Sequence, residues 1–152
     1  MINATNAHIL TDEAKLEQLT EAIERYEQIM ENRKKVVTNT KFYCETSLSS
    51  LITNAARKGL TAVSIKIGQG WYNSFEYGED YKVYGVLEDQ GETYADGRHS
   101  WTENYEIGKL HLPTLITIVE SCGYTVTQTG IEYFEYGLGK RKGVKLAISW
   151  AK

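Results

Sequence analysis

The sequence predicts a single α+β domain, with an N-terminal amphipathic helix and two further helices packed on a mainly antiparallel sheet. The chain has 152 residues, which is the usual size of one domain. Its 41% hydrophobic and 24% charged residues are typical of a globular protein. Segments with helical spacing of apolar residues are followed by segments in which apolar and polar residues alternate. We therefore expect residues 1–152 to form one domain.

The first predicted element is an amphipathic helix over 11–37. Thr11 is a suitable N-cap, and Asp12 and Glu13 fall in the first turn, where negative charge is favoured. Basic residues close the helix: Arg33, Lys34 and Lys35. Apolar residues recur at spacings of three and four: Leu16, Leu19, Ile23, Tyr26 and Met30. This is the spacing of a short coiled-coil seam. We favour a helix packed beside its own domain, and a homodimer through helix 11–37 is the alternative.

Two similar helix–strand units follow. In the first, a helix over 47–58 begins at a Ser47 cap, Gly59 stops it, and a strand covers 61–68. In the second, a helix begins at Pro113 and ends at Gly123, and a strand covers 124–129. Identical residues recur at six positions at an offset of 64, which leaves a two-fold αβ pseudo-repeat open. The end of the chain reads as a hairpin of strands 131–136 and 144–150, joined by a glycine- and lysine-containing tip.

The middle of the chain, 68–109, is an excursion rich in glycine, tyrosine and acid. A strand is expected over 81–87, and Asp96-Gly97 indicates a tight turn. Residues 76–106 carry nine acidic and two basic residues, a net charge of −7, although the whole chain carries only −3. Long connections inside compact domains are often functional, so this segment is the first place to look for a site.

The tyrosines and carboxylates of this segment predict a protein-binding surface. Tyrosine and tryptophan give large contact area at low entropic cost, and carboxylates attract a basic partner. We expect docking on a basic protein, such as a nucleic-acid-binding host complex. The expected contact residues are Tyr77, Glu79, Asp80, Tyr81, Tyr84, Glu88, Asp89, Tyr94 and Trp101. The other interpretation is a sheet face whose tyrosines pack and whose acids keep it soluble.

A second hypothesis is a binder of a nucleotide or small phosphorylated ligand. Glycines flank basic residues in 137–143, and backbone N–H groups beside ammonium groups can hold phosphate. The candidate phosphate-binding residues are Arg98, Lys140, Arg141 and Lys142. The spacing matches no phosphate-loop motif, and nearby carboxylates would repel phosphate, so the protein-docking hypothesis ranks first.

No catalytic motif or metal-ligand spacing is present, and we expect a non-enzymatic protein without a cofactor or metal. Of the three histidines, only His99 has polar neighbours in the sequence, Asp96 and Ser100. Residues that are adjacent along a loop do not form a triad by adjacency alone.

Cys44 and Cys122 lie far apart and are expected to be free thiols in a reducing compartment. The first ten residues lack the pattern of an export signal, and no apolar run would span a membrane, so we expect a cytoplasmic protein.

In overall style the chain resembles small accessory proteins encoded by phages and mobile elements. These combine a charged amphipathic helix at the start with a compact sheet ending in a strand such as that at 143–150. Anti-defence proteins, including anti-CRISPR proteins, belong to this group. The resemblance implies action without catalysis, by occupying a nucleic-acid site with acidic surface or by sequestering a nucleotide messenger. It carries no residue-level motif and assigns no functional residue. The leading hypothesis is thus an inhibitor or adaptor.

Overall fold

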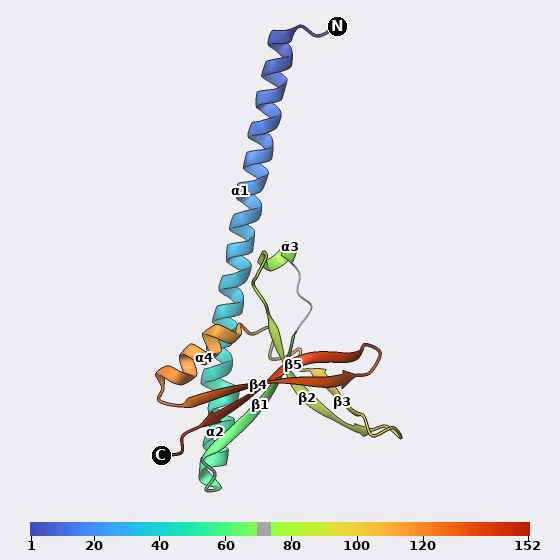
Figure 1. Cartoon of the computed structure of the whole chain (residues 1–152). Coiled ribbons are helices and arrows are strands. Elements are labelled where there is room, and N and C mark those ends of the chain that lie inside the picture. The colour runs from blue at the N-terminus through green and yellow to red at the C-terminus, as the bar shows by residue number, and fades with distance from the viewer. Residues whose placement is uncertain (70–73) are drawn as a thin grey trace.

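A computed structural model describes residues 1–69 and 74–152 and confirms the mixed α+β fold (Figure 1). The dominant element is one long helical rod. It consists of α1 (Ala4–Tyr43), a π-helical turn η1 (Cys44–Leu48) and α2 (Ser49–Arg57), with right-handed helical backbone at every junction. The expected break between a helix at 11–37 and a second one at 47–58 is therefore wrong. Ser47 lies inside the π turn and caps nothing.

The length of α1 follows from its caps. Asn3, and not Thr11, is the N-cap, since its side chain accepts a hydrogen bond from the Asn6 N–H. The Thr11 hydroxyl instead donates to the Ala7 carbonyl within the helix. No proline or glycine occurs before Gly59. There the backbone takes φ +81° and the rod stops, as the sequence predicts.

The π turn keeps the buried face of the rod on one side across the junction. Val36, Thr40, Tyr43, Leu48 and Ala55 are all buried. One wider turn absorbs an extra residue between Cys44 and Ser49, whose hydroxyl and N–H both donate to the Cys44 carbonyl. The C-terminal third of the rod can therefore lie along the sheet, whereas the start of α1 rises alone above the molecule in Figure 1.

Five strands form a sheet that closes on itself in chain order. They are β1 (Ala62–Gln69), β2 (Tyr84–Thr93), β3 (His99–Glu103), β4 (Thr125–Glu135) and β5 (Gly139–Ser149). All pairings are antiparallel except the β3–β4 pairing, which is parallel and brings Ser100 opposite Phe134. A short helix, α3 (Ser74–Tyr77), precedes β2, and α4 (Leu112–Ser121) connects β3 to β4.

The two predicted helix–strand units are present. Each of α2 and α4 ends at a left-handed glycine, Gly59 or Gly123, and is followed by a strand, and both strands flank β5. Three strand boundaries differ from expectation. β2 begins at Tyr84 and not at 81, β4 runs unbroken through Gly130, and β5 begins at Gly139 and not at 144. The supposed basic tip is therefore mostly strand, because Arg141 finds partners across the sheet.

The apolar core lies between the rod, α4 and one face of the sheet. Its fully buried members come from distant parts of the chain: Leu48, Ile67, Leu110, Leu115, Leu146 and Ile148. Polar bonds fix the rod to the chain around α4. The Asn39 amide donates to the carbonyls of Ile107 and Lys109, both at 2.8 Å, and the His111 N–H donates to the buried Thr40 hydroxyl at 2.9 Å.

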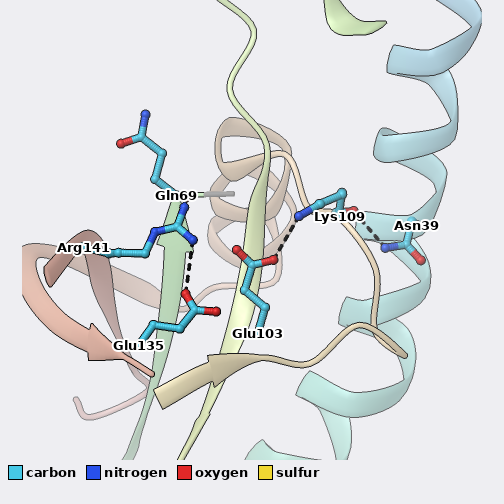
Figure 2. A network of polar contacts seen from close by, with 6 residues as sticks. All are labelled: Asn39, Gln69, Glu103, Lys109, Glu135 and Arg141. Carbon is cyan, nitrogen blue, oxygen red and sulfur yellow. Dashed lines mark hydrogen bonds and ion pairs between the residues drawn. The ribbon is translucent and has the colours of Figure 1, made fainter. Parts of the chain in front are cut away.

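The other face of the sheet encloses a polar interior (Figure 2). Two nearly buried carboxylates lie there, and each is paired with a cation. Glu103 accepts from Lys109 at 2.9 Å, while Glu135 accepts from Arg141 at 3.1 Å, and Arg141 also donates to the Gln69 carbonyl. Paired in this way, the buried charges are compensated. Lys109 also links this interior to α1, because its carbonyl is one of the two that Asn39 binds.

Tyr133 lies against Gly68 in this interior, and its buried hydroxyl has no hydrogen-bond partner among the described residues. A Cβ at position 68 would collide with that hydroxyl and would lie 2.9 Å from Leu87 Cδ2. Glycine is thus required here by close packing of the sheet.

We predict that Gly68→Ala lowers the free energy of unfolding by about 1–3 kcal/mol, because it overpacks the interior. Tyr133→Phe removes an unpaired buried hydroxyl and should leave that free energy unchanged or raise it. The double variant should be more stable than Gly68→Ala alone. Urea denaturation of the four proteins measures the coupling, and strictly additive effects would contradict the proposed contact.

Candidate interaction surfaces

The first candidate surface is the apolar seam of α1. Residues 1–28 are exposed throughout, and the predicted seam residues remain exposed in the folded chain. Their exposed fractions are 65% for Leu16, 57% for Leu19, 50% for Ile23, 64% for Tyr26 and 40% for Met30. The expectation that this part of the helix packs beside its own domain is therefore wrong, and the seam is free for a partner.

The seam points away from the body of the molecule. At about 100° per residue, Arg25, Asn32 and Val36 lie roughly 120–160° around the helix from the centre of the seam. All three meet the body. Arg25 stacks on Phe75 at 5.1 Å, Asn32 donates to the Glu76 carbonyl, and Val36 is buried. Docking at the seam would leave these contacts intact.

The second candidate surface is the acidic hairpin of β2 and β3. Glu88, Asp89, Glu92 and Asp96 are exposed on it. The pKa of Asp89 is lowered by the Gly91 N–H and by His99, and the pKa of Asp96 is lowered by the N–H and guanidinium of Arg98. The lowered pKa values keep Asp89 and Asp96 ionised at neutral pH. With more exposed carboxylates than cations, the hairpin presents a negative surface.

An aromatic cluster joins this hairpin to the turn between β4 and β5. Tyr94 packs edge-on against Phe134 at 5.4 Å and stacks with Tyr136 at 6.3 Å. Tyr136 is 75% exposed. Sequence reasoning selected Tyr94 and missed Phe134 and Tyr136, because only the parallel β3–β4 contact brings the two turns together. The Tyr94 hydroxyl donates to Glu92 at 3.4 Å, and the Arg98 guanidinium lies 4.3 Å over the Phe134 ring. Aromatic side chains exposed beside charged groups are typical of binding surfaces.

The other predicted tyrosines lie elsewhere. Tyr81 stacks on His111 at 4.4 Å and lies under the Arg33 guanidinium at 4.7 Å, while Tyr77 accepts from Arg33 through its carbonyl. Tyr84 packs on the apolar core. These three tyrosines attach the excursion to the helices. Glu79 and Asp80 are exposed beside them, in the connection from α3 to β2. The part of the predicted segment at 70–73, including Trp71 and Tyr72, lies outside the described residues.

The candidate phosphate-binding residues are only partly brought together. Arg98 and Lys140 line a shallow hollow of about 300 Å³ with Trp101 and Phe134. Each cation already has a carboxylate partner, Asp96 for Arg98 at 2.5 Å and Glu132 for Lys140 at 3.6 Å. Lys66 also approaches the hollow, with its ammonium 4.2 Å from the Trp101 ring.

The remaining two candidates point elsewhere. Arg141 is engaged inside the sheet with Glu135, and Lys142 is exposed opposite Glu132. The hollow therefore has aromatic faces that suit a planar ligand, but two of the three cations around it, Arg98 and Lys140, are already paired with carboxylates.

The polar residues around His99 do not assemble into a catalytic triad. His99 pairs with Asp89 and Thr93, Asp96 pairs with Arg98, and the buried Ser100 hydroxyl has no partner among the described residues. Across the described ranges, no group of three metal-binding side chains gathers, and no helix is both long and apolar enough to cross a membrane.

The two cysteines are free and differ in exposure. Cys44 is buried in the π turn, and burial raises the pKa of its thiol to about 11, whereas Cys122 is exposed after α4. At neutral pH the Cys44 thiol is therefore protonated and shielded.

No protein-family model matches the chain, and neither a curated protein nor a solved structure was found to be similar to it. The geometry of the surfaces therefore carries the functional argument.

The His111–Tyr81 stack predicts a pH dependence of stability. Burial, and then the nearby Arg33 charge, lowers the pKa of His111 below its usual value. The unfolded chain binds the proton more readily, so His111 destabilises the fold as the pH falls through its unfolded pKa of about 6.5. We expect the midpoint of urea denaturation to fall more between pH 7.5 and about 5.5 in the wild type than in His111→Gln. Equal losses in both proteins would contradict this assignment.

Proposed function

We propose that this protein is a non-enzymatic binding protein, an inhibitor or adaptor that docks on a basic protein through the two joined hairpin turns. The observation that carries the proposal is the Tyr94–Phe134–Tyr136 cluster with the carboxylates Glu88, Glu92 and Asp96 on the same hairpin. A cationic nucleic-acid groove on a host complex is the partner chemistry that fits this surface. An anti-defence role would be one form of such inhibition.

The two parts of the surface have different expected roles. Exposed carboxylates attract a cationic partner at long range and raise the association rate. Aromatic side chains in the centre of a contact slow dissociation, because they are desolvated only in the formed complex. Tyr77 and Tyr81 are not part of this docking surface, since both are held against α1 and α4.

A second candidate function is the binding of a planar, phosphorylated ligand in the hollow between Arg98 and Lys140. The aromatic faces of Trp101 and Phe134 support it. The pairing of Arg98 and Lys140 opposes it, because a phosphate would have to displace Asp96 or Glu132 from its cation. We therefore rank protein docking first.

The docking proposal predicts a charge effect on association. Proteins captured from lysate by the wild type and lost with Tyr94→Ala/Tyr136→Ala should be basic. Against such a protein, Glu88→Gln/Glu92→Gln/Asp96→Asn should slow association by about tenfold at low salt and flatten its salt dependence, as seen by surface plasmon resonance. The matched control is Glu17→Gln/Glu21→Gln/Glu120→Gln, which removes three exposed acids outside the hairpin and the flanks of the seam. Equal association rates for the hairpin variant and the wild type would contradict docking through this surface.

The two functions respond oppositely to the same variants. For a phosphorylated ligand, removing the hairpin carboxylates should leave binding unchanged or tighten it, and Arg98→Ala/Lys140→Ala should weaken it. Nucleotides released from freshly purified protein by acid and separated by chromatography provide the first test. Bound nucleotide that disappears with Arg98→Ala/Lys140→Ala would favour the second function over the first.

A further inference from the structure

We propose that α1 pairs in parallel with α1 of a second copy of this chain, so that the protein is a homodimer. The contact is the seam formed by Leu16, Leu19, Ile23, Tyr26 and Met30. It is separate from the hairpin surface, so either proposal can fail while the other stands.

The repeat along the seam suits a two-helix supercoil. Leu16, Ile23 and Met30 follow one another at intervals of seven residues, and Leu19 and Tyr26 lie three residues after the first two of them. Apolar residues in this a and d pattern keep one stripe in contact with a neighbouring helix. The stripe ends at a charged residue on each side. Asp12 occupies the d position before Leu16. Arg33 occupies the d position after Met30 and donates to the Tyr77 carbonyl at 2.6 Å.

The first part of α1 has little packing on its own chain, since residues 1–28 are all exposed. Between residues 11 and 31 the chain carries seven acidic and two basic residues. Several glutamates lie four residues apart, as in Glu13–Glu17 and Glu17–Glu21, and such like-charge pairs destabilise a lone helix. Burying the seam against a partner helix would supply the packing that most helices depend on.

The charges on the two flanks of the seam favour a second copy of the chain as the partner, with its helix parallel to the first. One flank carries Glu13, Glu24, Glu27 and Glu31, whereas between residues 8 and 32 the opposite flank carries Lys15 and no acid. In an antiparallel pair, the acidic flanks of the two chains would face each other. Glu13 of each chain would then lie opposite Glu27 of the other chain. In a parallel pair each acidic flank faces the acid-free flank of the other chain. A second copy in parallel is therefore complementary.

The contact area indicates a modest affinity. Five half-exposed apolar side chains expose roughly 100 Å² each, about 500 Å² per chain, and the stems of flanking residues add to it. Stable interfaces bury about 800 Å² per partner. We therefore expect a dimer that dissociates on dilution.

Light scattering over a dilution series of the full chain tests the dimer. The wild type should approach twice the mass of one chain at high concentration and fall to one chain on dilution. Leu19→Asp/Ile23→Asp should be monomeric at every concentration, with the thermal unfolding of the folded domain unchanged. The matched control, Leu10→Asp/Ala14→Asp, adds the same charge to the outer face of the same helix and should still dimerise.

Three results would overturn the proposal. They are a wild type that is monomeric at all concentrations, a seam variant that stays dimeric, and a seam variant whose domain unfolds. The last would show that the seam belongs to the core. If the wild type is monomeric but the hairpin variants still fail to bind the basic partner, the proposed function stands and only the dimer is disproved.

Disulfide cross-linking tests the direction. In a Cys122→Ser background, Leu16→Cys should oxidise to a covalent dimer, because identical seam positions are adjacent in a parallel pair. In the antiparallel register that places Leu16 beside Tyr26 of the second copy, the two cysteines would be about 15 Å apart along the axis, too far for a disulfide. Leu10→Cys on the outer face is the control and should stay reduced. Failure of Leu16→Cys to cross-link where light scattering shows a dimer would overturn the parallel arrangement.

Discussion

The rest of the chain covers only a small part of the long helical rod, and the other features of the structure follow from this constraint. Only the last part of the rod faces the sheet, where Val36, Tyr43 and Leu48 are buried and where Asn39 and Thr40 bind the chain around α4. The π turn lets this anchored face continue into α2. Before Ile29 the rod has no sheet to pack on and leaves its apolar seam in solvent. A lone helix of this composition is only marginally stable in water, and the anchoring of one end leaves the other end without packing from its own chain.

The two proposed surfaces lie apart on the molecule. The seam lies at the free end of α1, while the acidic hairpin and its aromatic cluster lie at the far side of the closed sheet (Figure 1). The paired charges in the sheet interior, Glu103 with Lys109 and Glu135 with Arg141, hold the strands that carry the hairpins (Figure 2). A parallel pair of α1 helices would present two hairpin surfaces from one assembly. Linked surfaces of this kind bind a repeated or bivalent target more tightly than one surface does.

The sequence predicted the elements whose signals are local. Alternation along β1 and β5, the glycine stops after α2 and α4, and the turn at Asp96-Gly97 are all confirmed. What it missed depends on distant partners. No local signal marks the π turn at Cys44, and Lys140 to Lys142 resemble a loop until Arg141 meets Glu135 and Gln69 across the sheet. Likewise, Tyr81 looks like a binding residue until His111 stacks on it, and Phe134 becomes part of a surface only beside Tyr94.

The central claim is that residues 12–30 of α1 are packed by a second copy and not by their own domain. Hydrogen exchange followed by mass spectrometry, at several protein concentrations, tests it most directly. Amides of residues 12–30 should become more protected as the concentration rises, while those of residues 36–57 should keep the same protection throughout. Strong protection of residues 12–30 that does not change on dilution, or no protection at the highest concentration, would contradict the claim.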